Sequence, residues 1–221
     1  MSDDWQIWQW LDSAFPAGAF AHSSGLEAAF QQNEIASVAD LASFIRASLD
    51  QFASSAAPFV VGVCRDVSAF EEADRAQEAM LTNHVANRAS RAQGRAVLAT
   101  ATQAFANELI QNLRAEVRRS NCPGHLAPIT GAVAAFLGLD ARQAVHLFLF
   151  THLRGLVSAS VRLGIVGPLQ GQAIQHEISA FGQELADRSL DRTIRQAAQT
   201  SPILEVLQAN HDRLYSRLFV S

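Results

Sequence analysis

The chain has 221 residues and a formal net charge of −4, with 49% hydrophobic but only 17% charged residues. This length fits one domain with a core of its own, and the acidic balance gives no indication of nucleic-acid binding. The apolar excess predicts that a partner protein covers part of the surface.

The first residues and the cysteines predict a cytoplasmic protein. The opening MSDDWQIWQW is acidic where a secretory signal would be basic. Cys64 and Cys122 stand far apart, without the spacing of a disulfide framework or a zinc finger. The longest apolar runs, AAPFVVGVC and AVHLFLF, fall short of the roughly 20 residues that span a bilayer. We therefore expect no membrane span.

In the first half of the chain the periodicity is helical. Over 38–53 apolar residues recur every three or four positions, which lines one helix face, and Ser37 with Asp40 forms a capping-box pattern. Only VVGVC at 60–64 has a strand-like composition, and its neighbours show no alternation. The stretch 84–119 is rich in good helix formers, and Gly94 is expected to weaken or bend it.

The second half begins after a break at 121–128, which holds two prolines and a glycine. A short helix is expected at 129–139. Asp140 and Gln143 then predict the start of a long helix that Gly164 ends. Prolines mark two further helix starts, at Pro168 and at Pro202. We therefore predict one all-α domain over 1–221, a bundle of roughly eight to ten helices with a C-terminal tail at about 201–221.

The irregular segment 15–30 raises the question of chemistry. Its AHSSG, at 21–25, nearly matches the G-x-S-x-G nucleophile elbow, but that elbow needs a preceding strand. Ser23 and Ser24 are better interpreted as a helix cap. The glycines Gly18 and Gly25 lack the lysine and the strand of a phosphate-binding loop.

The chain has seven histidines, and their spacing argues against a permanent metal site. None forms an HxH or HExxH motif or an i,i+4 pair, which would put two imidazoles on one helix face. His22 and His211 stay as candidates for transient contact with a passing ion, because both lie in irregular segments near the chain ends.

Two further patterns each leave two interpretations open. Small residues and one arginine share a face of the helix 141–163, which suits either tight packing within the chain or self-association: Thr151, Gly155, Ser158 and Arg162. The ending NHDRLYSRLFVS interleaves arginine with large apolar side chains, which is unusual for a chain end. This tail either docks on its own core or becomes ordered on binding a second protein.

Three runs together resemble the UreF-type urease accessory proteins. They are WQWLDSAFPAGAFAHSSGLEAA near the start, LVSASVRLGIVGPLQGQ at 156–172 and SPILEVLQANHDRLYSRLF at 201–219. The His-Ser form of the first run is similar to the plant-like branch of the family. Residues 56–125 match only in helical character.

The resemblance implies an all-α, non-catalytic, homodimeric adaptor with no tightly bound cofactor. Such proteins bind a UreD/UreH-type chaperone, and the pair recruits a UreG-type GTPase that helps to load nickel and carbamate into apo-urease. The complex, not this chain, would handle nickel. No nucleic acid or membrane is implied among the partners.

The resemblance also gives roles to particular residues. The first motif would form or support the surface that meets the GTPase and lines the route of the ion: Phe15, Pro16, Gly18, Phe20, His22, Ser23, Gly25 and Glu27. The tail would order on binding the partners, through His211, Arg213, Tyr215, Arg217, Leu218 and Phe219. Ser158 and Arg162 would hold the helix end that presents the first loop.

A different class of function remains open at this stage. A small all-α metal-binding or oxidative enzyme would use His22, His152 or His176 with nearby carboxylates. Such an enzyme requires stoichiometric metal or colour in the purified protein, whereas an adaptor is purified without metal and binds its partners.

Overall fold

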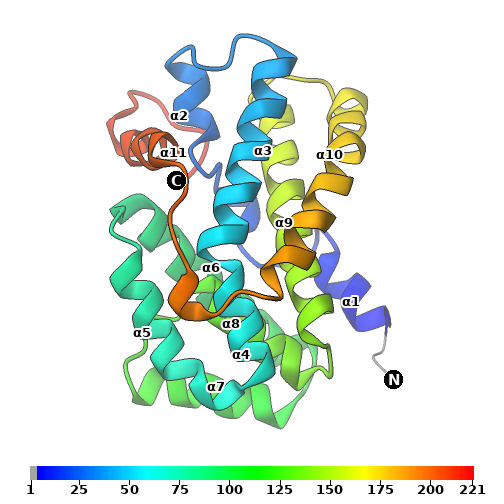
Figure 1. The fold of residues 1–221 in the computed structure, drawn as a ribbon, viewed down its shortest axis with the longest axis vertical. Helices are drawn as coiled ribbons and strands as arrows, with labels where there is room; N and C mark the ends of the chain where they lie inside the picture. The colour runs from blue at the N-terminus through cyan, green and yellow to red at the C-terminus, as the bar shows by residue number, and fades with distance from the viewer. Residues whose placement is uncertain (1–3) are drawn as a thin grey trace.

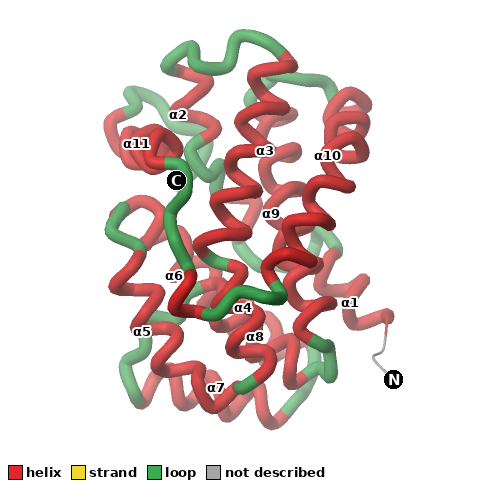
Figure 2. Tube along the Cα trace, viewed as in Figure 1, coloured by secondary structure: helices red, strands yellow, loops and turns green. Residues whose placement is uncertain are grey.

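The computed structural model describes residues 4–221, and this part of the chain is helical without strands, which confirms the all-α prediction. The helices are joined by short loops (Figure 2). They are α1 (Asp4–Leu11), α2 (Leu26–Gln31), α3 (Val38–Ser55), α4 (Ala57–Arg65), α5 (Phe70–Met80), α6 (His84–Ala104), α7 (Glu108–Arg119), α8 (Leu126–Phe136), α9 (Ala141–Arg162), α10 (Pro168–Ser189) and α11 (Pro202–Ala209). Single 3₁₀ turns lie at Ala19–Ala21, Val67–Ala69, Ile194–Gln196 and Asn210–Arg213.

Two helices form the centre of the core. α9 packs against α10, α4, α8 and α3, and α8 packs against α4 and α6. α8 is buried nearly all round from Ala127 to Ala134, as its unbroken apolar sequence requires. α9 is long and apolar enough to cross a membrane by composition alone. Its Leu149, Leu153 and Leu156 are buried in the fold, as expected of the core helix of a soluble protein.

The predicted helix ends are confirmed where the signal is local. Ser37 accepts a hydrogen bond from Asp40 N at the start of α3, and Asp140 with Gln143 forms a reciprocal capping box at the start of α9. Gly164, with φ +72°, follows the end of α9. Pro168 and Pro202 open α10 and α11.

Two helix boundaries differ from the prediction. The stretch 84–119 is two helices, because Asn107 accepts hydrogen bonds from Leu109 N and Ile110 N and so caps a new helix, α7. α6 continues through Gly94, where the missing side chain allows close approach to the loop before α8. VVGVC lies in helix α4, which agrees with the all-α prediction despite its strand-like composition. α8 begins three residues earlier than expected, with Pro128 in its first turn, where no backbone donor is needed.

The chain ends bring distant segments together. In Figure 1, α11 and the C-terminus lie beside α2 on one side of the molecule, whereas α1 lies on the other side. α11 contacts both α2 and α6. The first motif and the tail, which are separated by most of the chain, therefore meet.

Candidate functional site

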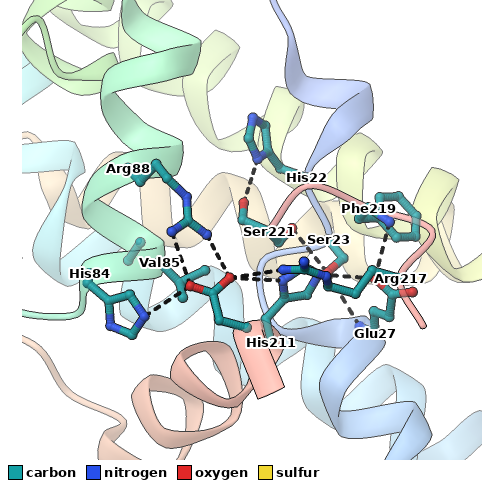
Figure 3. A network of polar contacts seen from close by, with 12 residues as sticks. His22, Ser23, Glu27, His84, Val85, Arg88, His211, Arg217, Phe219 and Ser221 are labelled. Atoms are coloured by element: carbon teal, nitrogen blue, oxygen red, sulfur yellow. Dashed lines mark hydrogen bonds and ion pairs between the residues drawn. The ribbon is translucent and has the colours of Figure 1, made fainter. Parts of the chain in front are cut away.

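The candidate site is the loop–tail junction, defined as the loop 15–25 with Glu27 and the tail 210–221. Its centre is the carboxylate of Glu27 on α2, which is only 1% exposed (Figure 3). Oε1 accepts a hydrogen bond from Leu218 N at 2.6 Å, and Oε2 accepts one from Phe219 N at 3.2 Å. His211 Nε2 lies 3.1 Å from Oε2. One buried carboxylate thus ties the tail to the first motif.

Backbone hydrogen bonds between the loop and the tail extend this attachment as far as Ser221. Val220 N donates to Ala21 O at 2.8 Å, and Ser23 N donates to Ser221 O at 2.6 Å. The His22 ring shares a 2.5 Å hydrogen bond through Nδ1 with Ser221 Oγ. Burial, and then the charges of nearby Arg88 and His211, lower the pKa of His22 to about 4. This imidazole is therefore neutral at pH 7.

Arg162 joins the loop and the tail to the end of α9. Its guanidinium carbon lies 4.0 Å from the ring centre of Phe20 and 4.2 Å from that of Phe219. It also donates a hydrogen bond from Nη1 to Phe20 O. Cation–π contact with two rings from opposite ends of the chain makes Arg162 a positioning residue for both segments.

Asp212 attaches the beginning of the tail to α6. Its carboxylate accepts hydrogen bonds from both terminal nitrogens of Arg88, at 3.1 and 2.8 Å, and from Arg217 at 3.2 Å. His84 Nε2 lies 3.1 Å away. The pKa of Asp212 is lowered to about 2, chiefly by the hydrogen bonds from Arg88.

Gly25 allows α11 to pack directly on the start of α2. It is the N-cap residue of α2 with φ +86°, and a Cβ there would lie 3.2 Å from Gln208 N. Gly25 has no side chain to cap the helix, and of the two expected serines Ser23 accepts a hydrogen bond from the first turn, at Glu27 N. The Ser23 hydroxyl lies 3.5 Å from Glu27 N and 3.3 Å from Ser221 O, so it serves the tail as well.

The remaining residues of the loop anchor it to the core. Phe15 stacks on Phe105 with 5.9 Å between ring centres. Pro16 O accepts a hydrogen bond from Thr100 Oγ1, and Gly18 has φ +74°. Phe15 is half-buried, whereas Pro16 and Gly18 are exposed. Phe20, which is 66% exposed, is the large apolar side chain that the loop presents to solvent.

The tail is docked on its own core, the first of the two alternatives. From Leu218 to Ser221 exposed and buried residues alternate, as in an extended segment with one face inward. α11, the tail and the loop each carry exposed apolar side chains: Ile203, Val206, Tyr215, Leu218, Val220 and Phe20. We call this set the outer apolar face. Arg213 is also exposed on the tail.

The other sequence candidates lie elsewhere. His211 is 0% exposed, so a passing ion does not reach it while the tail is docked. Thr151 and Gly155 line an internal cavity, and Ser158 is half-buried on α9. Of this face, only Arg162 contacts the loop and the tail, whereas Gly155 has no atom within 4 Å of the position of a Cβ. Within residues 4–221 no cluster of three or more His, Cys, Asp or Glu is arranged to hold a metal ion.

Known proteins match over nearly the whole chain. The sequence profile of the UreF family matches residues 35–179. Urease accessory protein F of Arabidopsis thaliana is 39% identical, covering 98% of this chain and 92% of the relative. The protein of the same name from Oryza sativa subsp. indica is 36% identical, covering 97% of this chain and 84% of the relative. Urease accessory protein UreF of Trichodesmium erythraeum is 28% identical, covering 100% of this chain and 98% of the relative.

Proposed function

Because this chain belongs to the UreF family of urease accessory proteins, we propose that it serves urease maturation as a non-catalytic adaptor. It bridges a UreD/UreH-type chaperone and a UreG-type GTPase, and the complex inserts nickel into apo-urease in the cytoplasm. The chain itself binds no cofactor tightly. The observation that carries this proposal is the outer apolar face, which the docked tail completes.

The composition of this face supports a protein partner. Tyr215 is fully exposed, Leu218 is 53% exposed, and Arg213 of the same tail is exposed as well. Aromatic residues and arginine are enriched in the buried centres of protein interfaces. An isolated monomer gains nothing from exposing them. The enzyme alternative has less support, because His22 and His152 bond to serine hydroxyls and face no carboxylate pair.

Replacing Leu218 by aspartate tests the docking role. The side chain points to solvent, so the fold is retained, but a charge enters the middle of the proposed interface. We expect the variant to lose co-elution with the UreD/UreH-type chaperone in size-exclusion chromatography. The matched control is Leu169→Asp at the start of α10, where an 88% exposed leucine lies outside the face. If both variants co-elute like the wild type, the outer apolar face is not the docking surface.

The homodimer is assigned to a second exposed face, on α1. Trp5 and Trp8 are 74% and 59% exposed and meet edge-on at 5.4 Å. Other residues of the same helix, Ile7 and Leu11, line a groove of about 440 Å³ together with side chains of α9 and α10. A two-fold interface needs a surface that is complementary to itself. A projecting tryptophan pair next to an apolar groove meets that requirement.

The substitution Trp8→Asp is expected to convert the homodimer into a monomer of 23.9 kDa without unfolding it. Light scattering on the eluting peak measures the mass directly. Leu109→Asp, at a 51% exposed leucine on α7, is the control and should leave the dimer intact. A wild-type chain that elutes as a monomer, or a Trp8→Asp variant that stays dimeric, contradicts this assignment.

A further inference from the structure

Helix α6 carries positive charge along the side that meets the tail. Residues 84–104 include arginine and histidine but no aspartate or glutamate. The basic side chains recur every three or four positions, which places them on one side of the helix: His84, Arg88, Arg91 and Arg95. The net charge of the chain is −4, so its overall composition does not explain a helix side without acidic residues.

The tail adds a further arginine to this side of α6. Arg88 donates to Asp212 from both terminal nitrogens, at 3.1 and 2.8 Å, and Arg217 donates to the same carboxylate at 3.2 Å (Figure 3). α6 and the tail are therefore joined at one acidic group. We call the cations that lie along this junction the basic face: His84, Arg88, Arg91, Arg95 and Arg217.

The basic face keeps a surplus of positive charge. Within residues 4–221 its ion pairs use two carboxylates only, those of Glu78 and Asp212. Asp212 is shared by Arg88 and Arg217, whereas Glu78 lies 3.7 Å from Arg91. The arginines thus outnumber the carboxylates that neutralise them. An exposed surplus of one sign attracts a partner surface of the other sign.

Arg95 is positioned to bind an acidic group from outside the chain. It is exposed, and its Nε donates to Pro123 O at 3.1 Å, a carbonyl that carries no net charge. This bond holds the guanidinium, while its terminal amino groups have no acceptor in the described part of the chain. Two parallel N–H groups of an arginine match the two oxygens of a carboxylate. Because the side chain is already held, binding a carboxylate there costs little additional conformational entropy.

We propose that the basic face binds an acidic surface of the partner protein that covers the outer apolar face. The inference rests on the proposed adaptor role and adds the charge of the partner's surface to it. The two faces are continuous along the tail, since Arg217 directly precedes Leu218, which is exposed in the outer apolar face. An apolar centre with a polar rim is the usual composition of a protein interface. A nucleic acid or a free phosphate, which binds arginines through charge, has no need of the apolar part.

Charges at the rim of an interface act mainly on the rate of association. The attraction operates before contact and is screened by salt, with a Debye length of about 10 Å at 0.1 M ionic strength. The basic face should therefore speed up the encounter with the partner at low salt and lose this effect at high salt.

The test measures the association rate of the full-length protein with the UreD/UreH-type chaperone by stopped-flow fluorescence. We expect Arg95→Glu to slow association by about 3–10-fold at low salt, and the difference to disappear near 0.5 M salt. The control is Arg65→Glu, which reverses the same charge at an exposed position at the end of α4, outside the basic face. It should associate like the wild type.

A second variant, Arg95→Gln, removes the charge without introducing the opposite one, and its rate should lie between those of the wild type and Arg95→Glu. Equal midpoints of thermal unfolding show that the variants are folded. If the wild type binds the chaperone but both Arg95 variants associate at its rate, the basic face lies outside the interface and the adaptor role still stands. If Arg65→Glu is slowed as much as Arg95→Glu, net charge alone sets the rate and the proposal is wrong. A wild type that does not bind the chaperone overturns the adaptor role and this proposal together.

Discussion

Replacing Glu27 by alanine is expected to detach the tail and to lower the free energy of unfolding by about 3–5 kcal/mol. The substitution leaves Leu218 N, Phe219 N and the buried His211 ring without their acceptor. Urea denaturation measures the loss of stability. Trypsin reports the tail separately, because cleavage after Arg213 and Arg217 should become faster once the segment is released.

Two further variants separate the carboxylate from general effects of substitution. Glu34→Ala removes a carboxylate from an exposed position of the loop after α2 and should leave both readouts unchanged. Glu27→Gln keeps the volume and one acceptor oxygen, so its effect should be intermediate. If Glu27→Ala unfolds at the same urea concentration as Glu34→Ala, the carboxylate does not hold the tail.

The second large effect is expected at Gly94, where alanine should lower the free energy of unfolding by about 3 kcal/mol. A Cβ at this position would lie 2.2 Å from Gly124 O and 2.6 Å from the carbonyl carbon of His125. The opposing backbone has little freedom to move, because Asp74 accepts 2.7 Å hydrogen bonds from the N–H groups of both Gly124 and His125. α6 or α8 must therefore shift.

The matched control is the same substitution at Gly155, which also lies inside a long helix but faces open space. There alanine should raise the free energy of unfolding by about 0.5–1 kcal/mol, since it restricts the unfolded chain. Urea denaturation of the two variants gives the comparison. Equal effects at the two sites would contradict the claim that the glycine at position 94 is needed for close packing against the loop before α8.

The sequence predicts those features of the fold that depend on residues close together in the chain. The caps at Ser37 and Asp140 and the proline starts of α10 and α11 depend on neighbours within a few residues, so they could be identified correctly. Asn107 carried a similar cap signal that the continuous helix-forming composition of 84–119 concealed. The close packing at Gly94 depends on a loop about thirty residues away, which no local pattern shows.

The sequence singled out both segments of the candidate site but not the contacts between them. The first motif and the tail were both singled out, yet Glu27 and Leu218 are 191 positions apart, and no spacing rule joins them. Asp212, Arg88 and His84 were missed for the same reason, since their contacts span 124–128 positions. The interleaving of arginine with large apolar residues in the tail marked it as unusual, but this pattern left docking and ordering on a partner equally open.

These connections bear on how an adaptor would work. Arg162 contacts both Phe20 and Phe219 and so joins the loop to the tail. On our proposal a partner binds this joined surface, and its binding would stabilise the docked tail by mass action. The residues predicted to meet the partners thus divide into buried ones that build the surface, such as Glu27, and exposed ones that are available for contact, such as Tyr215.

The most direct test of the account is the affinity of the chain for the UreD/UreH-type chaperone, measured by calorimetry for the wild type and for Leu218→Asp. A hot spot at the centre of an interface contributes about 2 kcal/mol or more, so we expect the dissociation constant to rise by about 30-fold or more. Leu169→Asp should bind like the wild type. Equal affinities for all three proteins would contradict the claim that the loop and the docked tail form the docking surface of this urease accessory protein.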